Sequence, residues 1–355
     1  MKIAVYAIAL NEAKHIERWV EATKDADYRL VADTGSTDGT PDMLARLGVD
    51  VYNISVKPWR FDVARNTALA LVPDWVDVCL ILDMDEVPEP GFFDKVREQW
   101  ISTANRGWVG LNTGSTWAAD RLHSRQGFVW KYACHEVAVP SMGTVVEHCV
   151  IDGALITHQP DNDKSRGQYL PMLEATVAEN PNDPRMLAYL AREYYFHERW
   201  QEIIDTAEKL GRVPDGWHVE RAATYRCRGY AHQQLGQLVD AEQWYVTGTE
   251  VAPEQPEAWF ALAQFYYTQE NWEKCWETAD RGLAEKPDTH YLTEESTTWR
   301  LHDLAAIAAW NLGKKGTAKK HSRIALELNP TDERLKNNYA HIVGTTAKEY
   351  ADGLS

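Results

Sequence analysis

Several features are missing from this sequence, and each absence removes a class of protein. No uninterrupted apolar stretch approaches the roughly 18 to 20 residues that cross a bilayer as a helix, so we expect no membrane span. No run of Lys and Arg could follow a phosphate backbone, and 37 basic against 53 acidic residues give a net charge of -16. Nucleic acid is therefore disfavoured as a partner.

Cysteine is scarce and poorly arranged for cross-linking. The cysteines are odd in number, widely spaced and contain no CxxC pair, which argues against a disulfide framework. We expect a reduced, cytoplasmic chain with buried thiols at Cys79, Cys134, Cys149, Cys227 and Cys275.

The length of the chain favours two domains, because 355 residues exceed twice the usual ~150 per domain. Up to about residue 160, short apolar runs alternate with helical stretches, which is typical of a mostly parallel α/β sheet. We predict strands at 2–10, 28–32, 49–55 and 76–82, and helices at 13–24, 41–47 and 62–71. The stretch 112–127, rich in Thr, Ser, Gly and Arg, is interpreted as a loop that closes over a ligand.

From about residue 181 the sequence predicts helices only, repeated with a period near 34 residues. Units begin near Pro184, Ala222, Pro256 and Trp299. Small or apolar residues recur at one position of each first helix and one of each second helix: Ala191, Gly229, Ala263 and Ala306, then Ile203, Ala241, Cys275 and Ala318. This pattern resembles tetratricopeptide repeats, with a final capping helix at 333–342. We predict domains at 1–160 and 181–345, a connector helix within 161–180, and a tail at 346–355.

Two acidic segments follow predicted strands, where ligands of open α/β sheets bind. In the first, DTGSTDGT at 33–40, two glycines permit a tight turn and Pro41 begins the next helix. In the second, Asp83 and Asp85 stand two residues apart in DMDE. Carboxylates held this close repel each other, and a divalent cation removes that repulsion. The alternative for either segment is a solvated acidic turn.

These segments, together with ALNE at 9–12 and FDVARN at 61–66, resemble an inverting glycosyltransferase of family 2 with the GT-A fold. The resemblance covers roughly residues 1 to 100. It implies that Asp33 contacts the base of a nucleotide sugar, that Asp83 faces the ribose, and that Asp85 binds Mn²⁺ or Mg²⁺ on the diphosphate. The remaining residues assigned to the donor site are Leu10, Asn11, Glu12, Gly35, Ser36, Asp38, Arg65, Met84 and Trp130. For Arg65, pairing with a phosphate or with Asp33 competes with a structural salt bridge.

The acceptor side is expected near YACHEV at 132–137 and ITHQ at 156–159. Inversion requires a base that takes the proton of the attacking group, and we choose Glu136, with His135 and Asp120 in reserve. The alternative is that His135 and Glu136 pair structurally. His158 follows a short apolar strand and suits the metal site beside Asp85 and Asp83, because imidazole is a ready ligand; a plain strand-end histidine is the alternative.

The sequence therefore predicts a metal-dependent inverting glycosyltransferase that uses a nucleotide sugar, with uridine favoured as the base. The repeats are expected to present a protein, peptide or glycan acceptor, or to form a homo-oligomer. Two alternatives remain. A nucleotidyltransferase would carry a glycine-rich basic loop after the first strand, which LNEA at 10–13 lacks. A non-catalytic repeat scaffold with a degenerate sugar-nucleotide-binding domain is the other.

Overall fold

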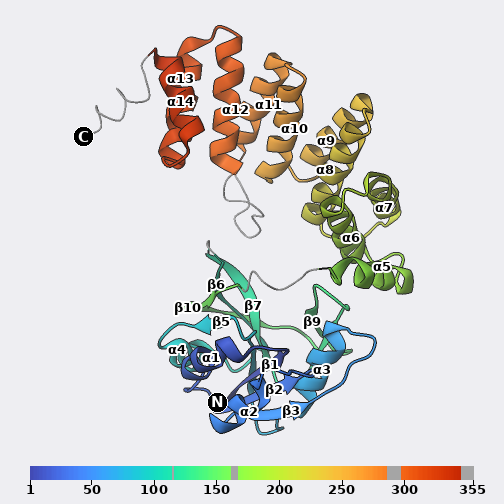
Figure 1. The fold of residues 1–355 in the computed structure, drawn as a ribbon, viewed down its shortest axis with the longest axis vertical. Helices are drawn as coiled ribbons and strands as arrows, with labels where there is room; N and C mark the ends of the chain where they lie inside the picture. Colours follow the sequence, from blue (N-terminus) through green and yellow to red (C-terminus); the bar gives the residue numbers. More distant parts are fainter. Residues whose placement is uncertain (114–115, 161–166, 286–296, 345–355) are drawn as a thin grey trace, which may run out of the picture. The chain divides into compact units, whose positions relative to one another are not determined.

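The computed structural model describes residues 1–113, 116–160, 167–285 and 297–344 (Figure 1). It divides into two compact units, Met1–Thr176 and Val177–Ser355. The expected connector overlaps α5 (Tyr169–Glu179), within which the two units meet along the chain. The expected tail, 346–355, lies outside the described residues. Among the helices that are described, none combines the length and the apolar character needed to cross a membrane.

The first unit is built on a mixed sheet of eight strands within the described residues, in the order β3-β2-β1-β4-β7-β6-β10-β5. Strands β1 to β4 are parallel to one another, and β7 is antiparallel to both of its neighbours. The strands are β1 (Ile3–Ala9), β2 (Tyr28–Asp33), β3 (Asp50–Asn53), β4 (Val78–Ile81), β5 (Glu86–Pro88), β6 (Arg106–Asn112), β7 (Thr116–Ser124) and β10 (His148–His158). A separate hairpin pairs β8 (Phe128–Lys131) with β9 (Val137–Pro140).

Successive side chains of β1 point to opposite faces of the sheet, and both faces are apolar. This explains why helices cover both of them. Ile3, Val5 and Ala7 belong to one buried cluster, together with side chains of α1 (Ile16–Ala22), α2 (Thr40–Arg46) and α4 (Phe92–Gln99). Ala4 and Tyr6 belong to the other, with α3 (Phe61–Leu71) and the β8-β9 hairpin. A short 3₁₀ turn, η1 (Ala13–His15), precedes α1. All of β4 is buried, as the apolar run at 76–82 predicts.

The prediction of a loop at 112–127 was wrong. Strand β7 occupies most of that segment and lies between β4 and β6 in the sheet. Its composition is misleading, because several of its polar side chains find partners in the fold. Asp120 pairs with Arg106, Arg121 with Glu86, and His123 with Tyr6.

The second unit is a helical repeat. Consecutive helices pack as pairs, and the predicted starts at Pro184 and Pro256 are the first residues of their helices. The helices are α6 (Pro184–Phe196), α7 (Trp200–Arg212), α8 (His218–Gln234), α9 (Leu238–Val251), α10 (Pro256–Thr268), α11 (Trp272–Ala284), α12 (Thr297–Asn311), α13 (Lys315–Leu328) and α14 (Glu333–Val343). Asp183 and Asp332 cap α6 and α14 by accepting hydrogen bonds from backbone N–H groups of their first turns.

The eight repeated small or apolar positions predicted from the sequence are all buried, which confirms the helical repeat. The reason for small residues is visible at two glycines. A Cβ on Gly229 would lie 2.9 Å from Cδ1 of Tyr245, and one on Gly282 would lie 2.4 Å from Cβ of Trp259. Helices that approach this closely leave no room for larger side chains.

Candidate functional site

The carboxyl ends of three adjacent parallel strands gather the polar segments singled out in the sequence. Strand β1 lies between β2 and β4, and Ala9 is in register with Asp33. Asn11 therefore follows β1 beside the turn that begins at Asp33, while Asp83 follows β4 on the other side. Residues far apart in the sequence meet at this edge because parallel strands end together.

The turn at 33–40 is organised by the Asp33 carboxylate. Its oxygens accept hydrogen bonds from the N–H groups of Gly35 and Ser36, each with a donor–acceptor distance of 2.9 Å. They also accept one from the Ser36 hydroxyl. Gly35 has φ +114°, a conformation that favours glycine. Asn11 accepts from Thr37 N–H over 2.8 Å and itself has φ +57°. Asp33 is 2% exposed, so its visible role is to shape this turn.

A second set of bonds ties the end of the turn to the segment after β1. The Asp38 carboxylate accepts hydrogen bonds from the N–H groups of Ala13 and Thr40, each with a donor–acceptor distance of 3.0 Å. The Thr40 hydroxyl donates to Asp38 and accepts from Glu12 N–H over 2.8 Å. Leu10 is half exposed nearby in the chain. These contacts hold the two segments predicted to flank a nucleotide against each other.

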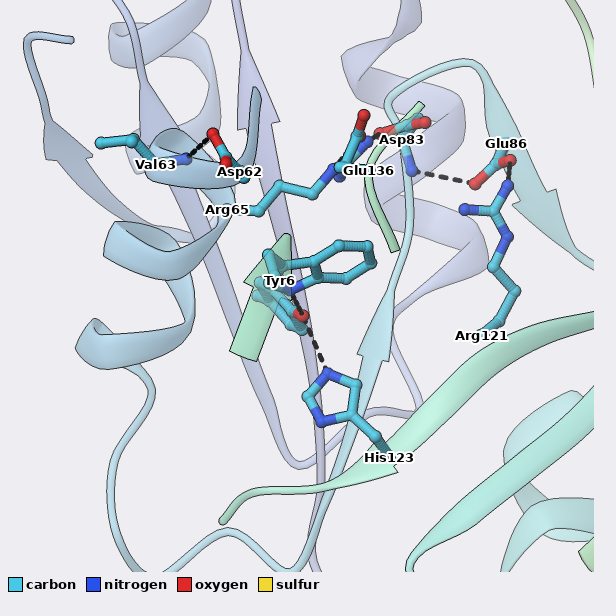
Figure 2. A network of polar contacts seen from close by, with 10 residues as sticks. Tyr6, Asp62, Val63, Arg65, Asp83, Glu86, Arg121, His123 and Glu136 are labelled. Carbon is cyan, nitrogen blue, oxygen red and sulfur yellow. Dashed lines mark hydrogen bonds and ion pairs between the residues drawn. The ribbon is translucent and has the colours of Figure 1, made fainter. Parts of the chain in front are cut away.

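Arg65, on α3, is the centre of the buried charges (Figure 2). Its Nε donates to Oε1 of Glu136 over 2.5 Å, and its Nη2 donates to Oδ1 of Asp83 over 3.0 Å. Burial alone would lower the pKa of Arg65, but the two carboxylates outweigh it and raise that pKa. The buried Nη1 has no hydrogen-bond partner within the described chain. Nη1 is thus a buried donor that the described fold leaves without a hydrogen-bond partner.

The ring of Trp130 contacts the guanidinium of Arg65. Its ring centroid lies 5.3 Å from Cζ of Arg65, within the range of a cation–π contact. The indole N–H donates to the Tyr6 hydroxyl over 2.8 Å, and that hydroxyl lies 2.8 Å from Nε2 of His123 (Figure 2). Trp130 is only 7% exposed, so in this structure its ring packs in the interior. The contact predicted with a sugar would need the small exposed part of the ring.

The orientation of this chain of hydrogen bonds follows from its ends. Nδ1 of His123 lies 2.8 Å from the carbonyl oxygen of Ser124, which can only accept, so Nδ1 carries the proton. Nε2 must then accept from the Tyr6 hydroxyl. Burial lowers the pKa of His123 to about 4, which keeps this imidazole neutral, and burial raises the pKa of Tyr6. These hydrogen bonds between neutral side chains therefore hold Trp130 in place, and through Trp130 they hold Arg65.

The four side chains of the DMDE segment at 83–86 have different surroundings. Asp83 reaches Arg65, and Met84 is buried in the sheet core. Asp85 lies beside His158 at the end of β10, with Oδ2 3.4 Å from Nε2. Glu86 accepts from Asp83 N–H over 3.0 Å and forms an ion pair with Arg121; burial raises its pKa. The hydrogen bond to Asp85 raises the pKa of His158.

The donor atoms fit a metal ion that is shared with a substrate. Within the described residues, no three His, Cys, Asp or Glu side chains form a group that could enclose an ion. Asp85 and His158 supply a carboxylate and an imidazole from adjacent strand ends, while Asp83 is bound to Arg65. Mg²⁺ is commonly held by one or two carboxylates together with substrate phosphates rather than by a complete protein cage. The pair suits that arrangement.

The three candidates for a base have different surroundings. Glu136 faces Arg65 and is mostly buried. His135, adjacent in sequence, has φ +53° and stacks on Tyr169 with ring centroids 5.6 Å apart. Asp120 pairs with Arg106 across β6 and β7. Glu136 contacts Arg65, which also holds Asp83.

Sequence reasoning missed the residues that support this group. Asn66 bonds Trp130, and Tyr6 and His123 continue the support into the core. Asn66 stands within the FDVARN segment quoted above, so its polar side chain beside Arg65 was an available signal. Tyr6 and His123 gave none, because a tyrosine in an apolar strand and an isolated histidine have no local pattern.

No protein-family model matches the chain, and no curated protein matches it. It is similar to solved structures of helical repeat proteins. A thermophilic TPR protein of Thermus thermophilus is 20% identical with a TM-score of 0.35, over 50% of this chain and 91% of its own. YrrB, described as a TPR protein with an unusual peptide-binding site, is 12% identical with a TM-score of 0.39, over 48% and 82%. At these TM-scores the likeness decides nothing about function.

Proposed function

We propose that the first unit is a metal-assisted inverting glycosyltransferase that uses a nucleotide-sugar donor, with a UDP-sugar favoured. The observation that carries the proposal is the meeting of two groups at the carboxyl edge of the parallel strands. One is the Asp85–His158 pair, and the other is Arg65 with Asp83 and Glu136. A carboxylate–imidazole pair beside a buried cation suits a diphosphate, whose charge must be neutralised as it leaves.

Each residue takes a role that its contacts allow. Asp85 and His158 would hold Mn²⁺ or Mg²⁺, which when bound offsets the negative charge on the diphosphate. Arg65 offers its unpartnered Nη1 to an anionic oxygen while Nε and Nη2 stay bound. The turn at 33–40 and Asn11 form a rim of backbone and side-chain polar groups for the nucleoside.

The reaction would run as a single displacement. The acceptor's attacking atom forms a bond to the anomeric carbon as the bond from that carbon to the diphosphate oxygen breaks. Glu136 takes the proton of the attacking group, and the nucleoside diphosphate departs with the electron pair. Because attack and departure are on opposite faces, the configuration inverts. Glu136 keeps its second oxygen for this step, since Arg65 binds Oε1.

A second candidate function is a sugar-nucleotide-binding scaffold without turnover. It is favoured by the contact between Arg65 and Glu136, because that contact commits one oxygen of the Glu136 carboxylate to a buried ion pair. In either case we propose that the helical repeat binds the partner, a protein or peptide acceptor in the first case. A glycan acceptor and a homo-oligomer remain predictions.

The test is release of nucleoside diphosphate from several UDP- and GDP-sugars, with Mn²⁺ and with a chelator. The proposal expects Mn²⁺-dependent release from at least one donor. It also expects E136Q to bind nucleotide while release falls by ~10²-fold or more, the usual scale for a positioned base. Donors that bind but stay intact at high protein concentration would favour the scaffold; donors that neither bind nor react would remove both functions.

A further inference from the structure

Three aromatic rings meet beside the turn that carries Glu136. Tyr169, the first residue of α5, stacks on His135 with 5.6 Å between the ring centroids and 17° between the ring planes. It also stacks on Phe61, the first residue of α3, with 6.4 Å between the centroids and 22° between the planes. One side chain of α5 therefore contacts both of the segments that supply the buried ion pair of Arg65 and Glu136.

The turn at 132–136, which joins β8 to β9, depends on contacts from outside. Tyr132 has φ +84° and His135 has φ +53°, a left-handed conformation that is disfavoured for residues other than glycine. Such a conformation persists only where the surrounding structure fixes it. The first N–H of α3 donates a hydrogen bond to the carbonyl oxygen of Ala133 with a donor–acceptor distance of 2.8 Å. The stack of Tyr169 on the His135 ring is another such contact.

The position of this turn matters for the chemistry proposed above, because Glu136 follows His135 directly. Arg65 holds Oε1 of Glu136, so the second oxygen is the one left for the acceptor's proton. A general base works only within hydrogen-bond reach of the proton that it takes. A displacement of about 1 Å in a reacting group can cost roughly 10²-fold in rate.

We propose that Tyr169 is a positioning residue for Glu136, acting through its stack on His135 and Phe61. The inference rests on the proposed function, since it assigns Tyr169 a part in the reaction of Glu136. Loss of the ring lowers the rate of the chemical step and leaves nucleotide binding intact, because the nucleotide is assigned to the strand ends. Helix α5 begins in the first unit and ends in the second, so this support belongs to the helix that both units share.

The experiment compares Y169L and Y169F in the full chain, with the UDP- or GDP-sugar that releases the most nucleoside diphosphate in the presence of Mn²⁺. We expect Y169L to lower kcat by at least about 10-fold. The KM for the donor and the affinity for UDP with Mn²⁺ should change by less than about twofold, as expected for a group that acts only on the chemical step. Y169F keeps the ring and should retain about half of kcat or more.

The matched control is Y28L. Tyr28 also makes an aromatic contact in the first unit, with Trp75 at 5.7 Å between the ring centroids. It is the first residue of β2 and so lies at the opposite end of that strand from Asp33. Y28L should keep the full rate. A fall in kcat as large as that of Y169L would show that any lost aromatic contact has this effect, and would overturn the positioning role.

A second measurement does not depend on activity. The Phe61 N–H bonds Ala133, so its hydrogen exchange reports whether the turn stays packed on α3. Exchange should be faster in Y169L and unchanged in Y169F and Y28L. If the unmodified chain releases no nucleoside diphosphate, the proposed function fails, while faster exchange in Y169L still shows that Tyr169 holds the turn.

Two results would overturn the proposal. One is unchanged Phe61 exchange in Y169L, and the other is a kcat of Y169L within about twofold of the unmodified chain, which a misplaced base does not allow. If Y169L does not fold, Y169M takes its place with the same expectations, because a flexible methionine fills the space without supplying a flat ring.

Discussion

The side-chain amide of Asn66 bonds both backbone polar groups of Trp130. Its Nδ2 donates a hydrogen bond to the carbonyl oxygen and its Oδ1 accepts one from the N–H, each with a donor–acceptor distance of 2.8 Å. Asn66, the residue after Arg65, thus makes the two hydrogen bonds that the backbone of an adjacent strand would make. In this way it joins α3 to β8. The helix that carries the buried arginine and the hairpin that carries Trp130 and leads to Glu136 are held in one arrangement.

We expect N66A to destabilise the first unit by about 2 kcal/mol, because two hydrogen bonds to buried backbone groups contribute roughly 1 kcal/mol each. Hydrogen exchange at the β8 amides measures the loss locally. The control is T67A, at the next residue of α3, whose hydroxyl bonds only its own helix and should change stability by less than ~0.5 kcal/mol. Equal effects of the two substitutions would show that the bridge contributes nothing.

Arg65 and Glu136 should be strongly coupled. R65M leaves Glu136 buried without its cation, and we expect a loss of about 3 to 5 kcal/mol. E136Q keeps the shape and removes the charge, so the double variant should be more stable than the sum of the single losses by about 0.5 to 3 kcal/mol. Urea unfolding of all four proteins measures the difference. Additive losses would mean that the contact is not an energetic pair.

The neutral state of His123 makes stability depend on pH. Its pKa is about 4 in the fold, below the ordinary value of about 6.5, so from pH 6.5 down to 4 the unfolded chain binds a proton that the folded chain does not. The free energy of unfolding therefore falls across this window, by about 2 kcal/mol between pH 6.5 and 5. H123Q cannot be protonated and should lose less. Hydrogen exchange at β1 amides compares the two proteins; parallel losses would contradict the assignment.

Helix contacts in the repeat unit predict opposite effects at two glycines. G282A places a Cβ 2.4 Å from Cβ of Trp259, where no flexible end can move aside, and should destabilise the unit by about 1 to 3 kcal/mol. G316A meets nothing within 4 Å near the start of α13 and should be neutral or stabilising by up to about 1 kcal/mol. Thermal unfolding by circular dichroism measures both. A stabilising G282A would mean that the helices do not pack this closely.

The sequence was most informative where local pattern and fold agree. The apolar run before Asp83 predicted a buried central strand, and the small residues at Ala263 and Cys275 predicted tightly packed helices. Both predictions depend on the periodicity and the apolar character of residues that are close together in the sequence. The gathering of Asn11, Asp33 and Asp83 at one edge also followed, because parallel strands that are adjacent end at the same side.

What the sequence could not supply are pairings across long separations. The segment that contains β7 was predicted as a loop because it is rich in Thr, Ser, Gly and Arg. Only the fold reveals the partners of Asp120, Arg121 and His123. The binding of Arg65 to both Glu136 and Asp83 joins residues 71 and 18 positions apart. No local spacing encodes such contacts, so the sequence left open whether Arg65 pairs with a phosphate, pairs with Asp33 or forms a structural salt bridge.

The central claim is that Asp85 and His158 hold a divalent ion against a nucleoside diphosphate. Calorimetric titration of the chain with UDP, with Mn²⁺ or with a chelator, tests it directly, using D85N and the exposed-residue control D94N. We predict that UDP binds at least 10-fold more tightly with Mn²⁺, that D85N abolishes this gain, and that D94N retains it. UDP affinity that ignores Mn²⁺, or a gain that survives D85N, would contradict the account.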